Sequence, residues 1–273
     1  MKKLTRTPEQ MPANTKIKLP KPFSVPSDDQ LSNFFYWDTY FINVVLGKLG
    51  DFKQMKNNLD NQKYLIEKLG FVPNADHLID RSQPPLYVSG VYDYFVLTGD
   101  KESLEGYVDA GLVEHKFWSE QRMSPCGLNV GGCTTPDEEL VPFCLYVLDR
   151  LHIDPDTVPD KVELGRNLMS MAESGWDFSP RFETDYSLFA ACDFAPIDLN
   201  SILYESEVKL AALCSVLNRE ADRERMQACA DKRRELMDKY MKDDDGIYLD
   251  YNFKTAGARK LSMRRQCIRT LSA

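Results

Sequence analysis

Two aspartates that directly follow a tryptophan are the residues of this sequence best suited to chemistry on a sugar. Asp38 follows Trp37 in the aromatic stretch FFYWDTYF, and Asp177 follows Trp176 in AESGWDFSPR. A carboxylate can hold sugar hydroxyls while the neighbouring ring stacks on the sugar's CH face. Burial against an indole raises a carboxyl pKa, as a general acid requires. The structural alternatives are core packing or a helix cap around Asp38 and an Asx turn at Asp177, and the local pattern alone slightly favours them.

Three further polar side chains lie in predicted loops between helices. Asn74 ends the segment FVPN, and Arg81 and Gln83 belong to the segment DRSQPP. Side chains of these types can converge on one pocket, and they can equally well cap the loops that carry them. Asp198 and Asn200, in the segment APIDLN, are expected to cap a helix.

The composition is that of a globular chain with an acidic balance. The 273 residues carry a net charge of −8, which disfavours nucleic acid and anionic membranes as partners. No apolar run reaches the roughly 20 residues that span a bilayer, and the first residues lack the apolar stretch of a signal peptide, so we expect a cytoplasmic protein. Seven cysteines without a CxxC pair and three histidines without an HxxxH pair predict no disulfide framework, no metal site and no cofactor.

Helices must position the candidate residues. Glycine, proline and capping residues divide the chain after residue 37 into segments with helical periodicity. Their expected ranges are 38–48, 52–68, 84–97, 102–121, 138–152, 160–173, 200–217 and 220–241. The alternating stretch 246–253 predicts a strand or one arm of a hairpin. Because no βαβ alternation is present, the paired helices predict an all-α fold of stacked helical hairpins.

The composition also divides the chain into three parts. Residues 1–30 contain five prolines and are predicted to form an extended leader, and residues 31–253 hold the helical domain. Residues 254–273 carry six basic side chains and no acid. We expect this basic tail to be disordered and to be the first segment that trypsin cleaves.

The segments that carry the candidate residues resemble the trehalase family of glycoside hydrolases. YWDTYF, FVPN, RSQPP, AESGWDFSPR and PIDLNSILY are similar to that family's YWDSYF, GxIPN, SRSQPPFF, ASGWDFSSR and PVDLNALLY, and they occur in the same order. The resemblance covers about residues 20–253, and the combination of RSQPP with GWDFS is specific. It implies an (α/α)6 toroid of six helical hairpins around an acidic pocket. The implied reaction is hydrolysis of α,α-trehalose to two glucoses with inversion.

The resemblance implies a role for each candidate residue. Asp177 corresponds to the general acid of the family. An inverting site also needs a second carboxylate about 6.5–9.5 Å from the acid, which activates a water. The residues implied to bind the small carbohydrate substrate are Trp37, Asp38, Asn74, Arg81, Gln83 and Gly175.

Departures from the family pattern concern the rest of the site. Gln30 stands where the family has an arginine, the family's RPES-type segment has no clear match, and neither QWDxPNGW nor GGGEY, which holds the general base, occurs. We therefore expect a truncated trehalase-like chain, an incomplete toroid with one short β element near its C-terminus and no general base. The alternatives are a related α-glucoside hydrolase of the same fold and a non-catalytic helical fragment that binds sugar or a partner chain. Open flanks of an incomplete toroid would expose apolar surface, so self-association is expected.

Overall fold

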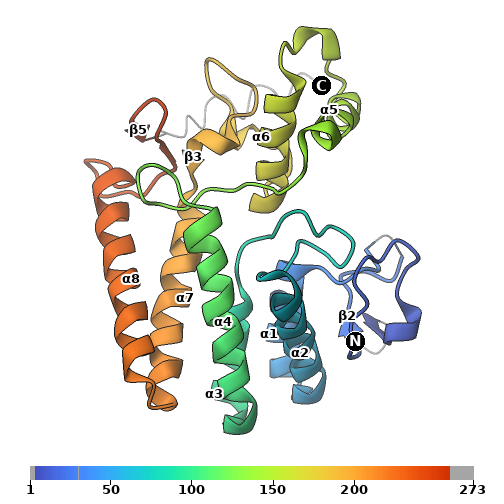
Figure 1. The fold of residues 1–273 in the computed structure, drawn as a ribbon, viewed down its shortest axis with the longest axis vertical. Helices are drawn as coiled ribbons and strands as arrows, with labels where there is room; N and C mark the ends of the chain where they lie inside the picture. Colours follow the sequence, from blue (N-terminus) through green and yellow to red (C-terminus); the bar gives the residue numbers. More distant parts are fainter. Residues whose placement is uncertain (1–3, 30, 259–273) are drawn as a thin grey trace.

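Eight α-helices dominate the computed structural model, which describes residues 4–29 and 31–258 (Figure 1). Each helix packs on its neighbour in sequence, which gives four pairs and confirms the all-α hairpin prediction. The helices are α1 (Tyr36–Lys48), α2 (Phe52–Leu69), α3 (Tyr87–Thr98), α4 (Lys101–Gln121), α5 (Asp137–Arg150), α6 (Lys161–Ser174), α7 (Ile197–Val216) and α8 (Glu220–Tyr240).

Local capping sets most of the helix boundaries. The side chains of Asp51 and Asp100 accept backbone N–H groups in the first turns of α2 and α4. Gly70 and Gly99 take the left-handed conformation at the ends of α2 and α3, with φ of 85° and 66°. Because such signals are local, the predicted helix ranges agree with the observed ones to within about three residues.

The start of α3 differs from the prediction. The helix begins at Tyr87 and not at Pro84. A residue that precedes a proline avoids the helical conformation, so Pro84 cannot be helical in front of Pro85. The backbone N–H of Tyr87 donates to the hydroxyl of Tyr36 (3.0 Å), which joins the start of α3 to the start of α1.

Three of the four pairs form a curved double row. Helix α3 packs between α1 and α7. Behind these three helices lie their partners in sequence: α2 behind α1, α4 behind α3 and α8 behind α7. Their shared core runs from the N-terminal segment through α1–α4 to α7 and α8. The molecule is thus an incomplete (α/α)6 toroid, as predicted, but the ring holds three helical pairs and not the four that a simple count of helices gives.

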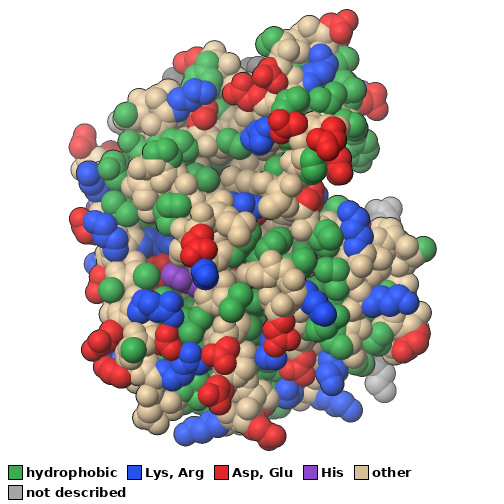
Figure 2. Space-filling model, in the orientation of Figure 1, with side chains coloured by type: hydrophobic (Ala, Val, Ile, Leu, Met, Phe, Trp, Pro, Cys, Tyr) green, Lys and Arg blue, Asp and Glu red, His purple; other side chains and the backbone are tan. Residues whose placement is uncertain are grey.

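The fourth pair, α5–α6, lies outside the ring as a lobe at its upper end (Figure 1). It has its own core, in which Leu148 and Leu168 pack with Phe182 and Phe194. In the space-filling view the outline is indented on the right, between this lobe and the body below it (Figure 2). Acidic and basic side chains are interspersed over the same face.

Short strands complete the described part of the chain. The strands β1 (Thr5–Arg6) and β2 (Phe23–Ser24) pair antiparallel, and so do β3 (Phe194–Ala195) with β4 (Tyr251–Asn252) and β4 with β5 (Gly257–Ala258). The β element expected at 246–253 is therefore present, with β4 as its strand. Gly246 lies at a bend, where φ is 81°, and Tyr248 forms an antiparallel bridge with Lys242, as one arm of a hairpin would.

The N-terminal segment packs on the helical body. Phe23 and Val25 are fully buried, and the backbone N–H of Ser24 donates to Asn58 of α2 (3.0 Å). The predicted domain boundaries at 30 and 253 stay predictions. Gln30 and most of the predicted disordered tail lie outside the described residues. Within the described ranges, no helix is both long and apolar enough to cross a membrane.

Candidate active site

The start of α1 carries the first two candidate residues. Trp37 and Asp38 lie in its first turn, where backbone N–H groups have no partner within the helix. The side-chain oxygen of Gln83 accepts the N–H of Trp37 (3.2 Å). Gln83, predicted to bind substrate, therefore acts in this structure as a cap of α1. Burial raises the pKa of half-buried Asp38, so its carboxyl holds a proton more readily than usual.

Gly175 brings the end of α6 against the start of α1. It ends α6 in the left-handed conformation, with φ of 77°. A Cβ at this position would lie 2.9 Å from the nearest carbon of the Trp37 indole. The contact joins two candidate residues that are 138 positions apart in the sequence, and Asp177 follows Gly175 by two residues.

We expect Gly175→Ala to destabilise the protein and to displace Trp37. A left-handed alanine costs about 1–2 kcal/mol, and the clash with the indole adds an overpacking cost of about 1–3 kcal/mol. The matched control is Gly99→Ala, at φ of 66° with no atom within 4 Å of the added Cβ, which carries the backbone strain alone. Urea unfolding should show the larger loss for Gly175→Ala, and only this variant should change tryptophan emission. Equal losses would contradict the contact.

Asn74 is buried and its groups hold the surrounding segments together. Its backbone carbonyl accepts the N–H of Tyr36 (3.0 Å), and its backbone N–H donates to Arg81 (2.8 Å). Its side-chain amide donates to the backbone oxygen of Ala172 in α6 (3.2 Å). Asn74 therefore links the FVPN loop to both α1 and α6, which is the loop-capping alternative considered from the sequence.

Arg81 points toward the α5–α6 lobe. Its guanidinium donates to Asp80 (2.9 Å) and to the sulfur of Met169 in α6 (3.4 Å), and it lies 5.9 Å from the ring of Phe143 in α5. Its Nε–H, which is buried, has no hydrogen-bond partner among the described residues. Arg81 thus keeps one donor available inside the site region.

The pKa of the Asp177 carboxyl is raised, which is the direction that favours a general acid. Burial raises the pKa of its carboxyl, and the positive charges of Arg81 and Arg150 only partly oppose this. Asp177 is exposed to solvent, so it can reach a bound molecule. Its neighbour Trp176 turns away, because the indole N–H donates to Asp198 (2.6 Å). The Trp176 indole N–H is therefore already hydrogen-bonded to Asp198.

Asp198 lies in the first turn of α7, where its side chain accepts the backbone N–H of Leu199 (2.9 Å), in line with the expected capping role, and it also belongs to a charged cluster. Arg181 donates to Asp198 (2.7 and 2.8 Å) and to Asp250 (2.7 and 2.8 Å), and its guanidinium lies 5.0 Å from the Trp176 ring. Burial would raise the pKa of Asp198, but the bonds and charge of Arg181 outweigh it and lower the pKa. Asn200, also expected to cap, accepts the N–H of Asn129 (2.9 Å) in a buried network.

The sequence analysis missed the buried carboxylate that holds the site segments together. Glu173, 1% exposed, accepts two hydrogen bonds from Arg122 (2.7 and 3.0 Å), one from the N–H of Ser82 (2.8 Å) and one from the N–H of Gly132 (2.6 Å). It thereby joins α6, the end of α4, the RSQPP loop and the glycine-rich loop CGLNVGGC at residues 126–133. Its place in AESGWDF, two residues before Gly175, was the only signal for it.

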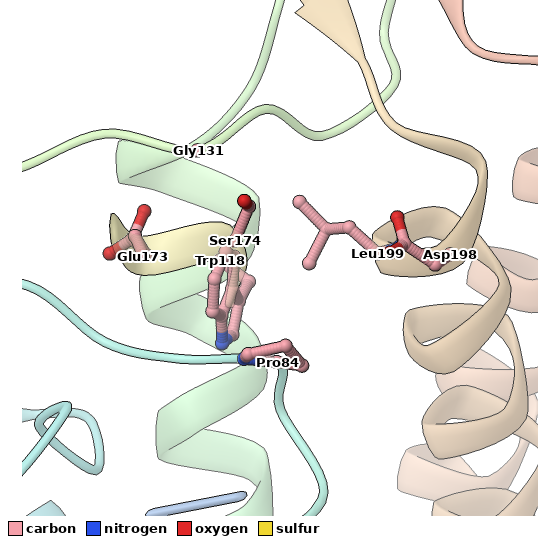
Figure 3. Close-up of a pocket in the computed structure, with 7 residues that line it drawn as sticks. All are labelled: Pro84, Trp118, Gly131, Glu173, Ser174, Asp198 and Leu199. Carbon is pink, nitrogen blue, oxygen red and sulfur yellow. The ribbon is translucent and has the colours of Figure 1, made fainter. Parts of the chain in front are cut away.

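A small cavity lies beside this carboxylate (Figure 3). Figure 3 shows Glu173, Ser174 and Trp118 on one side of it and Asp198 and Leu199 on the other. Its volume of about 10 Å³ is the space of a single water and far too small for a sugar ring. This cavity is therefore not the substrate pocket. Among residues 4–29 and 31–258, no group of three or more His, Cys, Asp or Glu side chains is arranged to hold a metal ion.

Comparisons with known proteins agree with the motifs. The sequence model of the family described as Trehalase matches residues 1–268. A periplasmic trehalase of Pseudomonas aeruginosa is 30% identical, with 92% of this chain and 49% of that protein covered. The solved structure of a neutral trehalase from Saccharomyces cerevisiae has a TM-score of 0.71 at 21% identity and covers 92% of this chain and 52% of its own. The chain spans about half the length of these relatives, and it belongs to the trehalase family.

Proposed function

We propose that this chain carries the general-acid half of a trehalose-hydrolysing site. The observation that supports it best is the contact of Gly175 with Trp37, two residues before Asp177, whose carboxyl pKa is raised by burial. A protonated Asp177 would donate its proton to the glycosidic oxygen as the bond to the leaving glucose breaks. The relative from Pseudomonas aeruginosa is named a trehalase, which favours trehalose as the substrate.

The other candidate residues divide into two groups in this proposal. Trp37 would stack on the glucose ring and Asp38 would accept its hydroxyls, while the charge of Arg81 tunes the Asp177 carboxyl. Asn74 and Gln83 would position the backbone, because their side chains already bond to α6 and α1. Gly175 would act through the close approach that it permits to Trp37.

The second carboxylate of an inverting site is not assigned to any described residue. Because the chain spans about half of its relatives, we propose that by itself it binds the sugar without rapid turnover. The alternative of a related α-glucoside as substrate would use the same acid. The partner is a small carbohydrate, and nucleic acid and membranes are not expected with a net charge of −8. Self-association belongs to the same proposal.

Tryptophan fluorescence tests the proposed sugar site. The sequence has three tryptophans, and we expect trehalose to change the emission of the wild type and of Trp176→Phe but not of Trp37→Phe. Trp176→Phe is the matched control because its indole bonds to Asp198 and not to the proposed sugar site. Asp177→Asn should leave the signal in place, since an acid acts on the reaction and not on ring stacking. A signal that survives in Trp37→Phe would contradict the site.

A glucose-release assay tests the proposed division of the catalytic groups. We expect the purified chain to turn over trehalose far more slowly than the about 10 s⁻¹ typical of enzymes. Turnover near that value would mean that a carboxylate within this chain serves as the base. In that case the Asp177→Asn variant should still be inactive, which keeps the role of the acid testable.

We propose a reducing compartment, such as the cytoplasm, as the location of the chain. The six cysteines of the described residues are all free, among them buried Cys144 and Cys214. The relative from Pseudomonas aeruginosa is named a periplasmic trehalase, so that protein lies in a different compartment. Cell fractionation with an antibody to this chain distinguishes the two locations.

A further inference from the structure

The segment that carries Asp177 is tied together on both sides of that residue. Before it, the indole N–H of Trp176 donates to Asp198 (2.6 Å). After it, the guanidinium of Arg181 donates to the same carboxylate (2.7 and 2.8 Å) and lies 5.0 Å from the Trp176 ring. These three side chains form a closed circuit, so Asp177 lies within a short loop whose two ends are held together.

Arg181 also fixes this loop to a second element. It donates two further hydrogen bonds to Asp250 (2.7 and 2.8 Å), which is buried and directly precedes β4. Asp250 in turn accepts the backbone N–H of Ile197 (2.9 Å), the first residue of α7. Because a planar guanidinium that bonds twice to each of two carboxylates is fixed in direction as well as in distance, Arg181 orients the loop against both α7 and β4.

The residue after Asp177 has a strained backbone. Phe178 has a φ of 51°, in the left-handed region that a bulky side chain rarely adopts. Such a conformation persists only where the surrounding structure enforces it. The Phe178 ring packs on the core of the α5–α6 lobe, 6.3 Å from the ring of Phe143, and Arg181 fixes the chain three residues later. Without the bonds of Arg181, the loop would relax toward an ordinary backbone conformation and carry Asp177 with it.

We propose that Arg181 is the positioning residue of the general acid and holds the loop of residues 176–181 so that the Asp177 carboxyl keeps its place in the site. The inference rests on the proposed function of Asp177. Arg181 acts through the loop, since its bonds go to Asp198 and Asp250. The other end of the loop is placed separately, because Gly175 packs against Trp37.

Arg181→Lys tests this role, because lysine keeps the positive charge and loses the planar fork. The charges that act on Asp177 are those of Arg81 and of Arg150 at the end of α5, and both remain in the variant. A change at Asp177 therefore reports its position. Burial raises the pKa of Asp177, so a loosened loop that exposes the carboxyl to water should lower this pKa toward that of an ordinary aspartate.

Carbon-13 NMR of the full chain, labelled at the aspartate carboxyls, measures this pKa without any sugar, and Asp177→Asn assigns the signal. We expect a downward shift in Arg181→Lys and a smaller one in Asp250→Asn, which weakens one side of the bridge and carries the test if Arg181→Lys does not fold. Hydrogen exchange of the amides of residues 176–181 should be at least about tenfold faster in Arg181→Lys, because the loop opens more often.

The matched control is Arg219→Lys. Arg219 also bridges two aspartates, Asp109 and Asp222, but it lies at the start of α8, whereas Asp250 follows the end of that helix. Arg219→Lys should leave the pKa of Asp177 unchanged. A folded Arg181→Lys with the wild-type Asp177 pKa, or an equal shift in Arg219→Lys, would overturn the positioning role.

The response of Trp37 to trehalose separates this proposal from the proposed function. We expect Arg181→Lys to keep that response, because the contact of Gly175 with Trp37 does not involve Arg181. A variant that loses it would show that Arg181 supports the whole sugar site and not the acid alone, which would also overturn the inference. Failure of the proposed function would appear in the wild type itself, as a Trp37 emission that does not respond to trehalose.

Discussion

Replacing Glu173 with alanine is expected to lower the free energy of unfolding by about 3–5 kcal/mol, the typical cost of removing one partner of a buried ion pair. The carboxylate is 1% exposed and Arg122, its partner, is 5% exposed. Its removal would leave the guanidinium and the N–H groups of Ser82 and Gly132 without their acceptor. Since small proteins are stable by only about 5–15 kcal/mol, a large share of the stability should be lost.

Urea unfolding followed by circular dichroism measures this effect. Glu163→Ala is the matched control, because it makes the same change at an exposed position of the same helix, and it should alter the free energy by no more than about 0.5 kcal/mol. Glu173→Gln keeps the shape of the side chain without its charge and should fall between the two. If Glu173→Ala loses less than about 1 kcal/mol, the carboxylate does not hold the four segments together.

The position of Glu173 also makes it important for the proposed sugar site. It bonds to the RSQPP loop on one side, and it precedes Gly175 and Asp177 on the other. Loosening this carboxylate should therefore weaken the trehalose signal of Trp37 even at temperatures where Glu173→Gln remains folded. A variant that is folded and binds trehalose normally would limit Glu173 to a purely stabilising role.

Features that depend on neighbouring residues could be predicted from the sequence. The end of α2 at Gly70 and the start of α4 at Asp100 follow from the left-handed glycine and the capping carboxylate, which act within one turn. The motifs around Trp37 and Asp177 pointed to one site, and the contact at Gly175 joins them. For the two helix ends a short segment contains the whole physical reason, whereas the contact between Gly175 and Trp37 joins residues 138 positions apart.

Features that depend on distant partners could not be predicted in this way. Glu173 and Arg122 are 51 residues apart, and nothing near either one signals a buried pair. The local pattern of Gln83 allowed both a sugar contact and a cap, and only the approach of Trp37 shows which group it bonds. The separation of α5–α6 from the ring likewise depends on the contacts of α3 with α7, which sequence periodicity does not contain.

A buried glutamate of α4 should make stability depend on pH. Glu114 of α4 accepts the hydroxyl of Tyr36 (2.8 and 2.9 Å) and the N–H of Val72 (3.3 Å), and Tyr36 in turn accepts the N–H of Tyr87. Burial raises the pKa of Glu114 to about 7, and the two hydrogen bonds only partly oppose this. The groups that donate hydrogen bonds to Glu114 are thus a neutral hydroxyl and a backbone amide, and neither carries a positive charge.

We expect this protein to become less stable as the pH rises from about 4.5 to about 7. In this range the unfolded chain releases the proton of Glu114 while the folded chain keeps it, so ionisation favours unfolding. At about 1.4 kcal/mol for each pKa unit, the loss attributable to Glu114 is about 3 kcal/mol, and it should level off above pH 7. Glu114→Gln, which cannot ionise, should lack this part of the slope, whereas Glu105→Gln at an exposed position of α4 should retain it. Urea unfolding at a series of pH values measures the difference, and parallel curves for the wild type and Glu114→Gln would show that Glu114 is ionised in the folded protein throughout.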